Sequence, residues 1–193
     1  MIRLPVVLVL LSGTVGCAAP PPPPEHLARK LAVLPVNNKT GEPLVVAGDG
    51  LLDRYVFRTE PATVSEVLEA EAVFQLRAKG FEIATPLSEK KVLSGRIPRD
   101  SADAAELAAQ AGLGPLCLYL EVRRWEPEGR AHVNYVIVDV EASLVDVQSR
   151  TLVWKHERRG PIGTPGNFLL EAACITAARR VAEDLLSPLA PAP

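Results

Sequence analysis

The pattern of apolar and polar positions after residue 30 predicts strands and helices in alternation. Residues 30–36 (KLAVLPV) form a nearly continuous apolar run, which is typical of an inner strand buried on both faces. Thr63, with Glu66 three residues later, predicts a capping box that starts a helix, and Gly80 suits the end of that helix. The other predicted strands cover 81–84, 116–125, 132–146 and 151–157, and the other predicted helices cover 101–111 and 168–186.

The same pattern predicts which side of each element is buried. In the strand 132–146, apolar residues alternate with Ile137, Asp139, Glu141 and Ser143, so one face should be buried and the other largely wet. The first long helix should bury Val64, Val67, Leu68, Ala72, Phe74 and Leu76. The last helix should bury Leu170, Cys174, Ala177, Val181 and Leu185.

The order of elements predicts the fold class. It is βαβα, then an antiparallel β-meander and a C-terminal helix, which favours one α/β (α+β) domain with a mixed sheet. This domain should span residues 30–187, followed by a Pro-rich tail at 188–193. Asn37 to Pro43 and residues 160–166 are predicted loops, Asp100 or Ser101 should cap the second helix, and 51–57 should form a short strand or helical turn.

The first residues predict export. Arg3 gives a small positive start, residues 4–11 are apolar, and residues 12–16 are mostly small. The apolar run is too short to cross a hydrocarbon core, which takes about 20 residues. It is typical of a signal peptide, here residues 1–16.

Cys17 is the predicted site of lipid attachment. Residues 14–17 (TVGC) resemble a lipobox, and ordinary cleavage to a soluble secreted protein is the alternative. Residues 17–29 would then be a lipidated cysteine with a Pro-rich tether, in which 20–24 are all proline and hold a stiff polyproline II conformation. The tether reaches roughly 35–40 Å, and a disordered leader with no specific role is the alternative interpretation. Ala18, following the cysteine, implies the outer membrane by the sorting rule known for such lipoproteins.

Composition and charge limit the classes of partner that we expect. The chain has 193 residues, 48% hydrophobic and 23% charged, as in an ordinary globular domain. The formal net charge is −2, with no dense basic stripe, so a nucleic-acid partner is not expected. Arg123, Arg124, Lys155, Arg158 and Arg159 could form a basic edge that faces anionic head groups or an acidic subunit. Solvated charges that protect a sheet edge explain them equally well.

The cysteines and histidines suggest no catalytic or metal site. With Cys17 lipidated, Cys117 and Cys174 remain, and a disulfide between them is one outcome in an oxidising compartment. Two free buried thiols are favoured, because Cys117 shares a face with Tyr119 while Cys174 faces the core. His26, His132 and His156 have no metal-ligand spacing and fit surface positions. Neither Gly-x-Ser-x-Gly nor a P-loop is present, so we expect no enzyme, metal or cofactor.

Two stretches resemble a known fold. Residues 31–41 (LAVLPVNNKTG) resemble the strand and turn that open TolB amino-terminal-like domains, and the join at Gly80 and Phe81 resembles the next step of that fold. Residues 141–154 (EASLVDVQSRTLVW) are similar to a meander in a bacterial lipoprotein family of unknown function. Domains of this kind also occur in curli-secretion proteins, in ring-forming exopolysaccharide-export lipoproteins and in lipoprotein activators of peptidoglycan synthases.

The resemblance implies a scaffold that works by protein contacts. We therefore expect a lipid-anchored, periplasm-facing accessory or assembly subunit of an export or transport complex at the outer membrane, with envelope protein partners and self-association. The alternative is a lipoprotein that activates a cell-wall synthase. The short tether disfavours this alternative, because such activators need a long linker. A small-ligand binder or enzyme has no supporting motif.

The lipid anchor gives a direct prediction. Cys17→Ala should release the protein from membranes into the soluble periplasm, because the acyl chains supply the membrane affinity. Fractionation of cells followed by immunoblotting measures this. Membrane association that the substitution leaves unchanged would contradict the lipobox interpretation.

Overall fold

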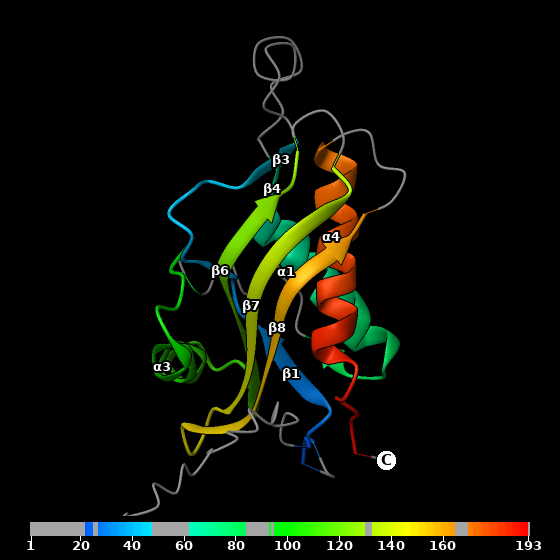
Figure 1. Ribbon diagram of the computed structural model, residues 1–193. Coiled ribbons are helices and arrows are strands. Elements are labelled where there is room, and N and C mark those ends of the chain that lie inside the picture. Colours follow the sequence, from blue (N-terminus) through cyan, green and yellow to red (C-terminus); the bar gives the residue numbers. More distant parts are fainter. Residues whose placement is uncertain are drawn as a thin grey trace, which may run out of the picture.

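The computed structural model describes residues 22–24, 27–47, 62–83, 93, 95–129, 133–164 and 170–192. The signal segment, Cys17, His26, His132 and the predicted element at 51–57 lie outside these residues. Of the described helices, those at 64–78 and 170–186 lie together beside the sheet, and the one at 101–111 lies apart from them (Figure 1). The strands are β1 (Lys30–Val33), β2 (Asn37–Asn38), β3 (Val45–Ala47), β4 (Ala62–Thr63), β5 (Glu82–Ile83), β6 (Leu116–Pro127), β7 (Tyr135–Asp146) and β8 (Thr151–Gly163), and the helices are α1 (Val64–Ala78), α3 (Ser101–Ala111) and α4 (Leu170–Leu186).

The main sheet is mixed, as the sequence predicts. Its order is β5-β1-β6-β7-β8, and β2 also pairs with β6. Strands β5, β1, β2 and β6 run parallel, whereas β6, β7 and β8 form a long antiparallel meander. Strands β3 and β4 make a separate two-stranded sheet. The predicted class, a single α/β domain that ends in a helix, is confirmed.

Local sequence signals fix the helix ends. Thr63 and Glu66 form the predicted capping box at the start of α1. At its other end, Gly80 adopts φ +94° while the amides of Gly80 and Phe81 bond back to Arg77 and Leu76, which is a Schellman motif. Asp100, one of the two predicted caps, accepts from the amide of Asp103 and starts α3.

Each face of the sheet has its own hydrophobic cluster. The larger lies between the sheet and the α1–α4 layer and contains Leu118, Val140 and Val181. The smaller lies under α3 and contains Cys117, Tyr119 and Val145. The described helices cover the two sides unequally, because α1 and α4 have 15 and 17 residues whereas α3 has 11.

Three predictions about burial were wrong. Phe74 and Leu170 are 65% and 44% exposed. Phe74 instead lines an open groove between α1 and α4 with Val67 and Ile175. In β7, Glu141 and Ser143 are buried, so the face that was expected to be solvent-exposed is exposed only in part.

The last strand extends beyond its predicted end at Glu157. It runs on through Gly163, into the predicted loop at 160–166. Gly160 and Pro161 suggested a loop, but the pairing with Val138 and Ile137 continues across them. Gly160 accommodates its φ of +101° without strain, and proline is tolerated in a border strand when its nitrogen faces away from the neighbour. Asn37 and Asn38, which were predicted to lie in a turn, form the short strand β2.

Cys117 and Cys174 are both free and buried. They belong to the two different clusters, on opposite faces of the sheet. The structure therefore contains no bridge between them and agrees with the favoured alternative of two free thiols. Burial raises the pKa of the Cys117 thiol to about 12, and it also raises the pKa of Cys174. Both thiols are thus held in their unreactive protonated form.

Thiol counting tests this arrangement. We expect two free thiols per chain after denaturation without reduction of the delipidated protein, and almost none before denaturation, since both groups are buried. A thiol reagent with an absorbance readout measures both values. A count of zero in the denatured protein would contradict the placement of the two cysteines on opposite faces.

Candidate functional site

The part of the sheet that extends beyond α3 carries a concentrated group of charged side chains. Glu121, Glu141 and Glu157 stand directly opposite one another on β6, β7 and β8. Like charges in such a row repel each other. The surrounding cations offset this repulsion. The charged sheet face, as we call it, consists of Lys39, Glu121, Arg123, Asp139, Glu141, Lys155, Glu157 and Arg159.

Arg123 connects the whole row of glutamates. Its guanidinium lies 2.6 Å from Glu121 and 3.6 Å from Glu157, and it also bonds Glu141. The fork of donors on an arginine suits several carboxylates at once, whereas a lysine is a single point charge. The hydrogen bonds to Glu121 and the nearby carboxylates raise the pKa of Arg123, so its charge is permanent.

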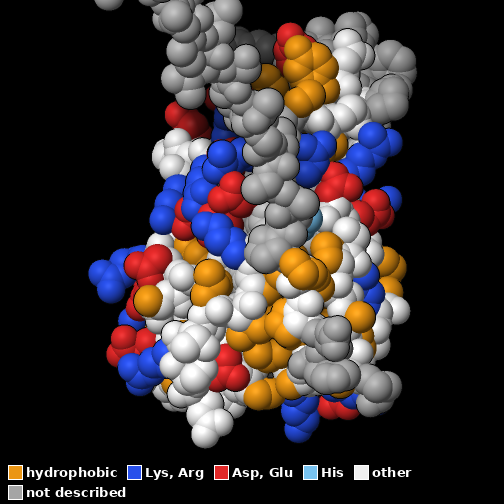
Figure 2. Space-filling view, turned by 60° about the horizontal axis from the view of Figure 1, so that its bottom comes forward, with side chains coloured by type: hydrophobic (Ala, Val, Ile, Leu, Met, Phe, Trp, Pro, Cys, Tyr) orange, Lys and Arg blue, Asp and Glu red, His pale blue; other side chains and the backbone are white. Residues whose placement is uncertain are grey.

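Lysines and a second arginine complete the neutralisation. Lys39, which follows β2, lies 2.7 Å from Glu121, and Lys155 lies 2.8 Å from Glu141. Arg159 lies 2.9 Å from Glu157 and 3.3 Å from Asp139. The face therefore holds four acidic and four basic groups. Figure 2 likewise shows acidic and basic side chains interspersed rather than separated by sign.

Glu121 is the most strongly perturbed acid of the face. It is buried, and burial pushes the pKa of its carboxyl upward. Three donors outweigh this effect and lower its pKa to about 2: the Lys39 ammonium, the Arg123 guanidinium and the Tyr119 hydroxyl, at 2.8 Å. Glu141 also has a lowered pKa, because Lys155 and Arg123 together outweigh the cost of its burial.

Tyr119 ties the charged face to the loop that precedes α3. Its hydroxyl donates to Glu121 and accepts a bond of 2.9 Å from the Asn37 amide, which also donates to the Arg99 carbonyl. Burial, together with the acceptor Glu121, raises the pKa of Tyr119. The phenol thus stays protonated as a donor, and the site has a fixed geometry.

The predicted basic edge is fully ion-paired. Besides the pairs above, Arg124 lies 2.5 Å from Glu126, and Arg158 lies 2.8 Å from Asp184 on α4. These residues therefore do not present a free positive patch to anionic lipid. Sequence reasoning selected the basic residues but missed Lys39, Tyr119 and the glutamates. The sequence feature that could have revealed the glutamates is the alternation of acidic and basic residues on three consecutive strands.

His156 is not the plain surface histidine that the sequence suggested. It is half-buried, its Nδ1 lies 3.0 Å from the Leu185 carbonyl, and its ring contacts Trp154 edge-on. The contact between His156 and Leu185 therefore links β8 to the end of α4. Among the residues that the structure describes, no group of three or more His, Cys, Asp or Glu side chains could hold a metal ion, and no helix is long and apolar enough to cross a membrane.

Comparison with solved structures finds the same fold. PelC from Paraburkholderia phytofirmans, crystallised as a dodecamer, is 22% identical and aligns with a TM-score of 0.53 over 90% of this chain and 94% of PelC. A second crystal form of the PelC dodecamer gives 21% identity and a TM-score of 0.53, over 91% and 97% of the two chains.

Weaker likenesses include two other bacterial proteins. A lipoprotein from Neisseria meningitidis is 15% identical, with a TM-score of 0.46 over 72% of this chain and 83% of the other. The C-terminal domain of LpoB from Salmonella enterica is 16% identical, with a TM-score of 0.39 over 71% and 84%. No protein-family model and no curated protein matches the sequence. The narrower likeness to TolB amino-terminal-like domains stays a prediction.

The low pKa of Glu121 makes stability depend on pH. Its value of about 2 in the folded chain lies below the ordinary 4.5. The contribution of this carboxyl is therefore complete above about pH 4.5, falls as the pH drops, and is lost below about 2. The expected size is on the order of 3 kcal/mol.

Urea denaturation between pH 2.5 and 7 measures this effect. Glu121→Gln should flatten the fall of the unfolding free energy below pH 4.5, because the titrating group is gone. Glu126→Gln is the control, since that carboxylate is 58% exposed and should contribute far less. Equal slopes for the wild type and Glu121→Gln would contradict the role given to Glu121.

Proposed function

We propose that this chain is a lipid-anchored, periplasm-facing subunit of a cell-envelope export or transport complex at the outer membrane. It acts by protein contacts and not by catalysis. The charged sheet face is the observation that carries the proposal. Four anions hold four cations in place there, and the cations stay 34–59% exposed, so a partner protein can reach them.

The geometry of that face suits recognition. Arg123 is 34% exposed and Lys155 is 41% exposed, while Glu141, which pairs with both, is only 8% exposed. Their positions are fixed before a partner binds, so little side-chain entropy is lost on binding. A fixed pattern of both signs selects partners and sets their orientation more than it adds affinity.

The sequence and the fold support the other parts of the proposal. The lipobox at Cys17 supports an anchor, and the proline run that follows keeps the domain near the membrane. PelC shares this fold and forms a dodecamer, which supports self-association as part of the function. The buried, protonated thiols and the backbone-bonded His156 support a role without catalysis.

In-cell crosslinking tests the proposal. The tagged full-length chain should crosslink to export or transport components, to itself, or to both, and mass spectrometry identifies the partners. Arg159→Ala should lower the crosslinking yield several-fold, because it removes an exposed cation from the charged sheet face. Arg179→Ala should leave the yield unchanged, since this arginine, paired with Glu71, lies on the α1–α4 layer.

Arg159 and Arg179 are closely matched, with side chains 59% and 58% exposed and each in an ion pair. An equal loss for both variants would show that the charged sheet face is not the contact. Recovery of a peptidoglycan synthase as the main partner would replace the proposal with the alternative, a lipoprotein activator of that enzyme.

A further inference from the structure

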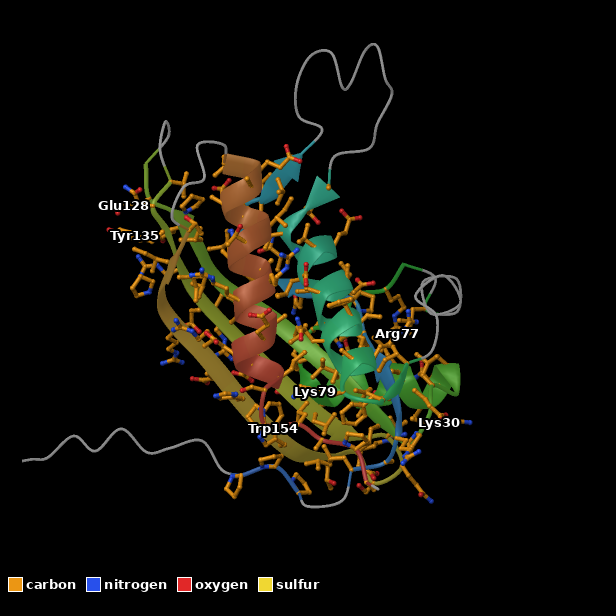
Figure 3. All side chains as sticks on the ribbon, turned by 90° about the vertical axis from the view of Figure 1, so that its right-hand side faces the viewer. Lys30, Arg77, Lys79, Glu128, Tyr135 and Trp154 are labelled. Atoms are coloured by element: carbon orange, nitrogen blue, oxygen red, sulfur yellow. The ribbon has the colours of Figure 1, made fainter. Side chains whose placement is uncertain are left out.

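β8 borders the main sheet along its whole length. It pairs with β7 on one side, and no described strand lies on its other side. Figure 3 shows β8 at the margin of the sheet next to α4, with Trp154 near its lower end. A border strand of 13 residues offers a row of backbone donors and acceptors to another chain.

Pro161 identifies which backbone groups face outward. Proline has no N–H, so within this strand it takes a position that does not donate to β7. The carbonyls of Arg159, Pro161 and Gly163 accept from arginine side chains rather than from β7. The backbone N–H and C=O groups of successive residues in a strand face opposite sides. The backbone groups of Lys155 and Glu157, like those of Pro161, therefore face outward.

In the C-terminal half of β8, arginine side chains of the same chain already bond the outward-facing carbonyls. The Arg158 guanidinium bonds the Arg159 carbonyl and lies 3.3 Å from the Pro161 carbonyl, and Arg180 lies 2.6 Å from the Gly163 carbonyl. At the other end, a bulge at Val153 shifts the register. The stretch Lys155–Glu157 lies between the bulge and the bonded carbonyls. In the described part of the chain, no side chain bonds its outward backbone groups.

We propose that the stretch Lys155–Glu157 binds the same stretch of a second copy of this chain as an antiparallel strand. The pair is centred on His156, so Lys155 stands opposite Glu157 of the second copy, and Glu157 opposite its Lys155. The contact is isologous, because the same surface is used twice. The exposed Leu152 lies beside it and supplies apolar surface for the contact.

The charges select this register. Across the sheet, Glu121, Glu141 and Glu157 form a row of three acids, and the proposed pairing ends that row with a lysine. Pairings centred on Lys155 or on Glu157 place like charges opposite each other, which is unfavourable. Charge complementarity therefore favours the second copy, in one register, over an arbitrary strand.

This inference rests on the proposed function in one respect. The pairing uses few residues, and a common lipid anchor confines two copies to one membrane surface and raises their effective concentration. An isologous contact closes at two copies, so a larger assembly would need a further surface.

The experiment compares Lys155→Pro with Lys155→Val in the full-length chain, extracted from membranes in mild detergent. Both variants lose the lysine side chain, and only the proline variant also loses the outward N–H. Sedimentation velocity should show at least tenfold weaker self-association for Lys155→Pro than for Lys155→Val. Phe74→Glu, which changes the exposed groove between α1 and α4, should associate as the wild type does.

Hydrogen exchange of the wild-type chain gives a second readout that needs no substitution. The amides of Lys155 and Glu157 should gain protection as the protein concentration rises, whereas the amide of His156, which bonds β7, should be protected throughout.

Equal association of the two Lys155 variants when both fold, or exchange at Lys155 and Glu157 that is independent of concentration, would overturn the inference. Loss of association only in Phe74→Glu would place the contact in the groove. Crosslinking to envelope partners that persists after such a failure would leave the proposed function standing.

Discussion

Arg123 contacts three glutamates in register and makes the pairing of the meander strands compatible with their charges. The meander brings Glu121, Glu141 and Glu157 side by side, because the pairing of β6, β7 and β8 is also set by the apolar residues on the opposite face. A register shift of one residue would move these apolar residues out of the core and the acids into it. The packing of one face thus enforces the repulsion on the other, and Arg123 relieves it.

The unequal cover of the two faces explains why the charges lie where they do. α1 and α4 together bury the apolar face, whereas α3, the helix described on the other face, is too short to cover that face from end to end. Under α3, the second face is apolar, with Cys117 and Val145. Beyond α3 it is charged, and Tyr119 marks the boundary with its ring in the cluster and its hydroxyl on Glu121. The same side chain belongs to the core and to the candidate site.

The sequence predicted the features that depend on neighbouring residues. The capping residues Thr63 and Asp100 and the glycine at position 80 place the helix ends, because each signal acts within one turn. Strand alternation placed Cys117 on the face of Tyr119, and the helical repeat placed Cys174 on the buried side of the last helix. Phe74 fits the apolar pattern of its helix, yet that pattern does not tell which part of a broad apolar side meets the sheet.

The charged sheet face was harder to predict, because its pairs join residues far apart in the chain. Lys39 and Glu121 meet only once β2 has paired with β6, and Arg123 meets Glu157 across two strand registers. The end of β8 was missed because Gly160 and Pro161 are typical loop residues. Their place in a border strand depends on the direction of one proline nitrogen.

The proposed function and the proposed strand pairing together describe a lipid-anchored subunit that associates with other proteins, including itself, through its sheet. Electron cryo-microscopy of the full-length lipidated chain in lipid nanodiscs tests it most directly. The particles should contain more than one copy, with the sheet continuing across β8 from one copy to the next and the charged sheet face accessible to partners. Single-copy particles at all protein concentrations, or assemblies in which β8 faces solvent, would contradict it.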